Sequence, residues 1–123
     1  MSLPESEEEL LLLHNPRCSK SRATLALLEE RGVDVAVRLY LEDPLSRDEI
    51  VELGRRLGKP VAAFTRQKQA EFAEAGLDAE STDEAIAAAM ASHPILLERP
   101  ILVRGGRAAI GRPPEDVLAL IDG

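Results

Sequence analysis

The hydrophobic positions in the first part of the chain predict a strand, a helix and a second strand. The run Leu10 to Leu13 is short and wholly apolar and ends at His14-Asn15-Pro16, which is typical of a strand buried on both faces. From Cys18 to Arg31 there is no Pro or Gly, leucines recur at helical spacing, and Gly32 follows where a left-handed cap is favoured. Alternation from Val35 to Tyr40 predicts the second strand. Together these elements form a right-handed crossover unit.

The middle of the chain has helical patterning. A helix predicted from Ser46 to Gly58 opens on a capping box, because Ser46 is followed three residues later by Glu49. The stretch from Pro60 to Ala75 predicts one or two short helices. A second capping box, Ser81 with Glu84, predicts the start of an Ala-rich helix.

The last part of the chain returns to strand patterning and then to a helix. Ile101 to Val103 and Ala108 to Ile110 flank a Gly105-Gly106 turn and predict a β-hairpin, and Pro114 suits the first turn of a final helix. The order β, α, β, several helices, β, β, α predicts an α/β fold with a thioredoxin-like (glutaredoxin-like) mixed sheet and a helical insertion. We expect a disordered acidic tail over residues 1–9 and a single domain over residues 10–123.

Composition and charge narrow the function. Aromatic residues make up 2% of the 123 residues and the formal net charge is −7, so we expect no nucleic-acid partner. No apolar run is long enough to cross a bilayer and the start of the chain is acidic, so we expect a cytoplasmic protein with no membrane contact. One cysteine and two separated histidines predict neither an internal disulfide nor a metal site. We also expect a monomer without a bound cofactor.

Cys18 is the candidate for chemistry because of its position, where a buried strand turns into a helix. Unpaired N–H groups and the positive end of the helix dipole stabilise a thiolate there, and Arg17 adds positive charge. The same N–H groups, with the hydroxyls of Ser19 and Ser21, could cradle a tetrahedral oxyanion. The alternative is a buried, inert cysteine, against which the charged and hydroxyl-bearing neighbours argue.

Other residues around Cys18 leave alternatives open or exclude motifs. His14 is either a partner that favours the thiolate or a histidine satisfied by hydrogen bonds at a strand end, and Asn15 either braces the loop or is an ordinary turn residue. A phosphatase-like loop needs an arginine where Thr24 stands, and a dithiol motif needs a cysteine where Ser21 stands. An oxidised Cys18 therefore needs a thiol from elsewhere, and glutathione followed by glutaredoxin is the natural source.

Four segments in register carry a resemblance to a known family. The segments are His14 to Arg22, Thr65-Arg66-Gln67-Lys68, Glu98-Arg99-Pro100-Ile101 and Ile110-Gly111-Arg112-Pro113-Pro114-Glu115. On these segments the chain resembles the ArsC arsenate reductase family, particularly its YfgD-like subgroup, in a match that runs in order across nearly the whole chain from Leu10 onward. The family's fold is a thioredoxin-like sheet with a helical insertion, in agreement with the order predicted above.

The resemblance implies an enzyme and assigns roles. Cys18 would attack arsenate, glutathione would add to the thiol-arsenate as co-substrate, and glutaredoxin would remove the glutathione as arsenite leaves. Arg66, Arg99 and Arg112 would hold the oxyanion, for which guanidinium forks are suited. The resemblance also implies a cis bond before Pro100, facing the cysteine.

Two alternatives remain open from the sequence. The same cysteine could serve a glutathione-linked thiol oxidoreductase that acts on another substrate or oxyanion. The chain could instead be a binding module, since Spx-type regulators share this fold and bind RNA polymerase. Those regulators typically carry a two-cysteine switch, whereas this chain has Ser21 in place of the second cysteine.

Overall fold

The computed structural model describes residues 2–121, and its contacts divide the chain into two compact units. The first, which we call the sheet unit, consists of residues 1–43 and 99–123. The second, the helical unit, consists of residues 44–98 and coincides with the predicted insertion. This division into units does not test the prediction of a single domain over residues 10–123, which stays a prediction.

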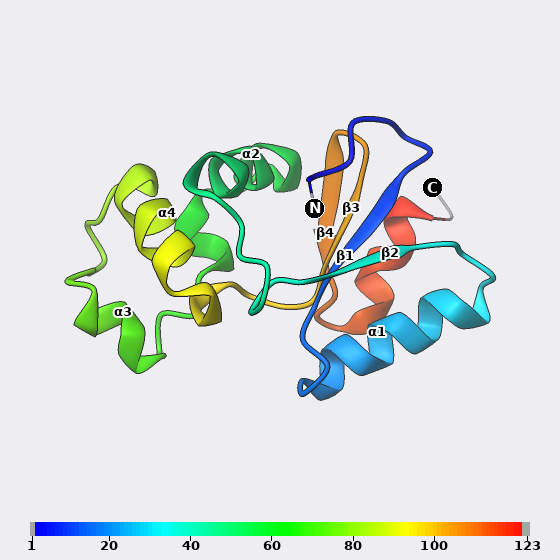
Figure 1. Ribbon diagram of the computed structural model, residues 1–123, viewed down its shortest axis with the longest axis horizontal. Helices are drawn as coiled ribbons and strands as arrows, with labels where there is room; N and C mark the ends of the chain where they lie inside the picture. The colour runs from blue at the N-terminus through cyan, green and yellow to red at the C-terminus, as the bar shows by residue number, and fades with distance from the viewer. Residues whose placement is uncertain (1, 122–123) are drawn as a thin grey trace. The chain divides into compact units, whose positions relative to one another are not determined.

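The sheet unit contains a four-stranded mixed sheet with the strand order β2-β1-β3-β4 (Figure 1). The central strand β1 (Leu10–His14) pairs in parallel with β2 (Ala36–Leu39) and antiparallel with β3 (Ile101–Arg104). The last strand, β4 (Arg107–Ile110), completes the predicted hairpin through the Gly105-Gly106 turn. This arrangement confirms the thioredoxin-like fold, with the crossover helix α1 (Ser19–Glu30) between the two parallel strands.

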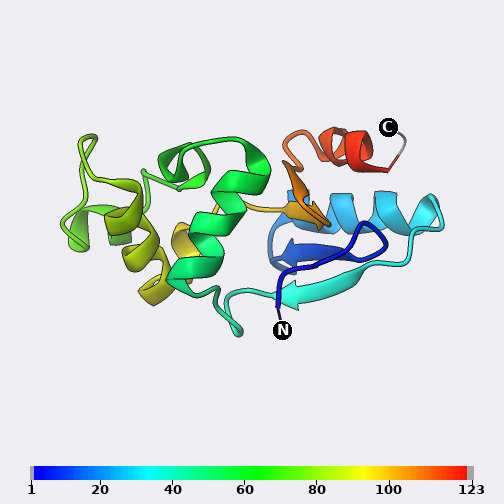
Figure 2. The same cartoon turned by 90° about the horizontal axis from the view of Figure 1, so that it is seen from above.

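One face of this sheet is covered by α1 and a closing 3-10 helix, η3 (Pro114–Leu120), which lie on the same side of the strands (Figure 2). Leu12 and Leu102 from the sheet pack there with side chains from the two helices, in a cluster with Leu28, Val117 and Leu120. The segment predicted as a final α-helix is thus helical, but of the tighter 3-10 type. Burial of this apolar cluster fixes the start of α1 beside the end of β1.

The helix α1 ends as its sequence predicts. Gly32 has a φ of +68°, and its N–H donates to the carbonyl of Glu29 while the N–H of Val33 donates to that of Leu28. These two bonds form a Schellman motif, in which a glycine accepts the left-handed conformation at little cost.

Residues 2–9 have specific contacts with the hairpin, where the sequence predicts a disordered acidic tail. Arg104 Nε donates to the carbonyl of Glu7 over 2.8 Å, and Arg107 Nε lies 3.1 Å from Glu7 Oε1. Leu3 is buried. The acidic segment therefore has arginine partners that lie about a hundred residues further along the chain, and its own composition does not predict them. Met1, the first residue of the predicted tail, lies outside the described residues.

The helical unit contains α2 (Arg47–Leu57), η1 (Val61–Phe64), α3 (Ala70–Glu74), α4 (Asp83–Ser92) and η2 (Pro94–Leu96). The capping box of Ser46 and Glu49 is present, and Gly58 caps α2 with a φ of +68°. The second capping box is wrong: Thr82 is the N-cap of α4 and accepts from the N–H of Ala85. The Ser81 hydroxyl instead accepts from the N–H of Asp78, so the preceding turn uses it.

Candidate active site

Cys18 is the N-cap residue of α1, as its sequence position predicts. Its backbone is extended, with φ −97° and ψ 124°, and its carbonyl accepts the first helical hydrogen bond, from Arg22 N–H at 3.0 Å. The loop from β1 closes on it through a bond from Cys18 N–H to the Asn15 carbonyl, also 3.0 Å. The thiol is buried, with 9% of the residue exposed. The sulfur therefore lies at the positive end of the helix dipole with little water around it.

The surroundings lower the pKa of the Cys18 thiol. Burial alone would raise it, because a thiolate loses hydration there. Hydrogen bonding from the N–H and hydroxyl of Ser21 and from the N–H of Lys20 outweighs this effect, and the charge of Arg99 adds to it. Ser21 is wholly buried, so water does not compete for its hydroxyl group. The site favours the nucleophilic form of the thiol.

Two of the three arginines implied by the resemblance lie beside Cys18. Arg112 Nη2 is 3.8 Å from Cys18 Sγ, and Arg112 Nε donates to the Arg99 carbonyl over 2.7 Å. The bond between Arg99 and Pro100 is cis, as the resemblance implies, and the bond between Arg112 and Pro113 is also cis. The two guanidinium groups and the sulfur thus come from three separate segments of the sheet unit.

Gly111 lets these segments approach one another. Its N–H donates to the Pro100 carbonyl over 2.8 Å. A Cβ on this residue would lie 2.8 Å from Pro100 Cγ and 2.8 Å from Thr24 Oγ1, which is closer than real Cβ contacts. Glycine at this position therefore allows Arg112 to follow directly alongside the sulfur. Sequence reasoning missed Gly111 as a site residue, although its place before Arg112 in a matched segment is a signal that could have found it.

The loop before Cys18 contains the other predicted residues. Asn15 braces it, because Asn15 Oδ1 accepts from Arg17 N–H at 3.0 Å. His14 is buried and its Nδ1 atom has no hydrogen-bond partner within residues 2–121. Burial, and then the charge of Arg22, lower the pKa of His14, so its ring is neutral at neutral pH. The side chains of Arg17 and Ser19 are exposed beside the cysteine.

Arg66, the third implied arginine, belongs to the helical unit. It follows η1, its N–H donates to the Leu96 carbonyl over 2.7 Å, and its Nη1 donates to the Ile95 carbonyl over 3.3 Å. These bonds hold its backbone and side chain against η2. Its role in oxyanion binding stays a prediction.

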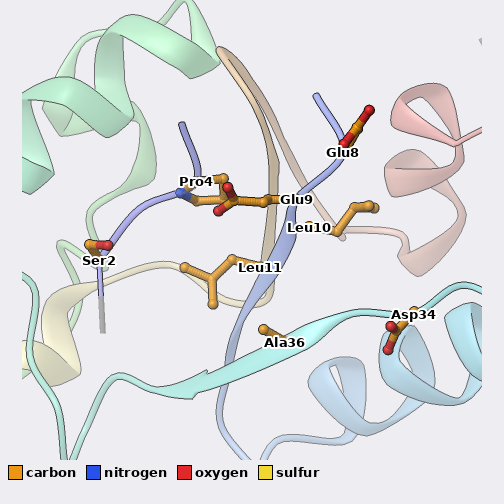
Figure 3. A pocket seen from close by; sticks show the side chains of 8 residues that line it. All are labelled: Ser2, Pro4, Glu8, Glu9, Leu10, Leu11, Asp34 and Ala36. Carbon is orange, nitrogen blue, oxygen red and sulfur yellow. The ribbon is translucent and has the colours of Figure 1, made fainter. Parts of the chain in front are cut away.

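Two hollows of the sheet unit lie at opposite ends of β1. The larger one, about 560 Å³, lies at the start of the strand, where Leu10 and Leu11 meet the acidic side chains of Glu8, Glu9 and Asp34 (Figure 3). The smaller one, about 250 Å³, lies at the other end, beside the loop that leads to Cys18. The lining of the smaller hollow includes residues 14–17, which lead to Cys18, but not Cys18 itself.

The fold and the position of the cysteine define a class, the thioredoxin-like proteins with a single cysteine at the start of the first helix. The ArsC family model matches residues 13–120. The chain is 45% identical over 115 residues to a Neisseria meningitidis serogroup A protein named "Arsenate reductase", which covers 92% of this chain and 98% of that protein. It is 46% identical over 116 residues to "Uncharacterized protein YfgD" of Escherichia coli K12, over 93% and 98% of the two chains.

A solved structure leads to the same family. The "Arsenate reductase from Vibrio cholerae" superposes with a TM-score of 0.86 at 47% identity, over 91% of this chain and 97% of that one. The chain belongs to the ArsC family. Among residues 2–121, no helix is long and apolar enough to cross a membrane.

Proposed function

We propose that this protein is an arsenate reductase in which Cys18 is the nucleophile. The observation that carries the proposal is the thiol at the N-cap of α1 with Arg112 Nη2 at 3.8 Å and Arg99 contributing to its lowered pKa. Arsenate reductase is also the name of relatives that are 45% identical over nearly their whole length. Cationic groups beside a buried sulfur both stabilise the thiolate and attract an oxyanion.

The proposed reaction begins with attack of the Cys18 thiolate on arsenic. A bond forms between Sγ and arsenic as one arsenate oxygen leaves as water, and Arg99 and Arg112 hold the remaining oxygens. The sulfur of glutathione, the co-substrate, then bonds to arsenic as a second water leaves. A glutaredoxin thiolate takes the glutathione sulfur as a mixed disulfide and leaves the electron pair on arsenic, and one water then cleaves the Sγ–As bond to release arsenite and the Cys18 thiol. Over the cycle, As(V) accepts two electrons from two external thiols, which yields arsenite, one disulfide and one water.

An external reductant follows from the cysteine count. The chain has one cysteine, so no second thiol of its own can resolve an adduct on Cys18. We therefore propose glutathione and glutaredoxin as partners of a cytoplasmic, monomeric enzyme without a bound cofactor, because glutathione keeps thiols reduced in that compartment.

The test is arsenate-dependent NADPH consumption with glutathione, glutaredoxin and glutathione reductase. The wild-type protein should turn over and Cys18→Ser should not, because serine lacks a thiolate at neutral pH. Glu30→Gln is the matched control, since its exposed carboxylate lies at the far end of α1 and is not among the groups that change the pKa of Cys18. Absence of turnover while Cys18 is still readily alkylated at neutral pH would contradict arsenate as the substrate and favour a glutathione-linked reaction on another one.

A further inference from the structure

The smaller hollow beside the cysteine loop has a mixed lining that suits a charged organic ligand. The cavity of about 250 Å³ is lined by side chains from the ends of β1 and β2 and from the segments that follow them: His14, Asn15, Pro16, Arg17, Leu39, Leu41 and Glu42. All of these residues belong to the sheet unit. The carboxyl ends of neighbouring parallel strands are where open α/β sheets commonly bind ligands.

The register of the sheet separates this hollow from the arginines. His14 pairs with Leu39 of β2, which lines the hollow. On the other side of β1, Leu13 pairs with Ile101, which directly follows Pro100. The arginines beside the sulfur therefore lie on the β3 side of β1, whereas the hollow lies on its β2 side. Cys18 follows β1 itself, so the strand that leads to the sulfur has the hollow on one side and the arginines on the other.

The lining of the hollow has two opposite charges and an exposed apolar side chain, which together indicate the kind of ligand that it can bind. Arg17 and Glu42 are both exposed and line the same hollow, and within residues 2–121 neither side chain forms an ion pair or hydrogen bond. Leu41 is 39% exposed, although large aliphatic side chains are usually buried. The volume lies below the roughly 300–1,000 Å³ of pockets for drug-sized ligands, so it suits a group of amino-acid size.

We propose that this hollow binds the thiol reductant by its amino-acid-like end, the γ-glutamyl group of glutathione. The Arg17 guanidinium pairs with the α-carboxylate of that group, the Glu42 carboxylate pairs with its ammonium, and Leu41 covers its methylenes. The inference deepens the proposed function and rests on it for the role of the reductant. It assigns binding of the reductant to the β2 side of β1, whereas the arginines on the β3 side would bind the oxyanion.

The experiment measures binding without chemistry. Full-length Cys18→Ser protein is titrated with S-methylglutathione, which cannot form a disulfide, and amide chemical shifts are followed by NMR. We expect shifts to concentrate in residues 14–17 and 39–42. S-methyl-γ-glutamylcysteine should bind within about threefold of this probe, whereas S-methylcysteinylglycine, which lacks the γ-glutamyl group, should bind at least tenfold more weakly.

Charge variants of the same protein locate the contact. Arg17→Gln and Glu42→Gln should each weaken binding of S-methylglutathione about five- to tenfold, whereas Glu30→Gln, an exposed charge on α1, should leave it unchanged. Shifts centred on residues 99–112, or equal binding of the two truncated thiols, would overturn the inference. Because no arsenate is present, a failure of arsenate turnover would contradict the proposed function without changing this result.

Discussion

At the level of single residues, the lowered pKa of Cys18 comes from a few short-range groups. The charges that the sequence places nearest, on Arg17 and Arg22, are not what lowers its pKa. Arg22 Nη1 instead donates to the Pro16 carbonyl over 3.0 Å. The effective groups are the Ser21 hydroxyl and the N–H groups of the first helical turn, with Arg99 from a distant part of the chain. These groups therefore favour the thiolate despite its burial.

The alkylation rate of Cys18 should follow this lowered pKa. We expect half of the maximal rate with iodoacetamide at a pH below the usual value of about 8.5 for a free thiol. Ser21→Ala should move the profile to higher pH and slow alkylation on its acidic limb by up to about tenfold, since a hydrogen bond to a charged group contributes about 1.5 kcal/mol. Ser19→Ala should leave the profile in place. A profile that rises only above pH 8 in the wild type would contradict an activated thiol.

At the scale of elements, the site depends on how closely β4 and the segment after it approach the cis-proline turn. The contact of Gly111 with Pro100 and Thr24 leaves no room for a side chain. In contrast, a Cβ on Gly106 in the hairpin turn would have nothing within 4 Å. Packing requires glycine at position 111 but not at position 106, so substitutions at the two positions can be compared directly.

Gly111→Ala should destabilise the fold and disturb the site together. Overpacking of this kind costs about 1–3 kcal/mol of unfolding free energy, which urea denaturation would measure. Because Arg112 follows directly, its guanidinium should move from Cys18 Sγ, and the KM for the oxyanion should rise. Gly106→Ala should change the unfolding free energy by less than about 0.5 kcal/mol. Equal stabilities and KM values for the two variants would show that the approach at Gly111 is not required.

At the scale of the whole molecule, one cysteine and no second thiol determine how the protein responds to oxidation. Cys18 can form a disulfide only with a thiol from outside the chain. Its 9% exposure allows a small thiol to reach the sulfur more easily than a second copy of the protein. The expected product is a mixed disulfide rather than a disulfide-linked dimer.

Incubation with oxidised glutathione should therefore add one glutathione to each chain. Intact-mass spectrometry should detect this single adduct in the wild type and none in Cys18→Ser, and glutaredoxin with glutathione should remove it. A predominance of chains linked through Cys18 would contradict this expectation.

Local sequence pattern was enough to predict most of the helices and strands and to place Cys18 at the start of a helix. Leucine runs, glycine caps and the capping box of Ser46 depend on neighbours within a few residues, so α1, α2 and the hairpin were confirmed where local pattern predicts them. The resemblance added the cis bond at Pro100. Ser81 and Thr82 are both suitable N-cap residues, and local pattern could not tell which of them caps α4. Thr82 is the cap, because the Ser81 hydroxyl already accepts a hydrogen bond from the N–H of Asp78 in the preceding turn.

Which groups lie beside the sulfur depends on contacts between elements that are far apart in the chain. Arg112 is 94 positions from Cys18 along the chain, and its 3.8 Å approach depends on the pairing of β1 with β3 and of β3 with β4. The contact of Glu7 with Arg107 and the packing of Gly111 against Thr24 likewise join residues that are far apart in the chain. Distances between residues far apart in sequence are set by the burial of apolar side chains from several elements at once, whereas local pattern reports only what each element prefers alone.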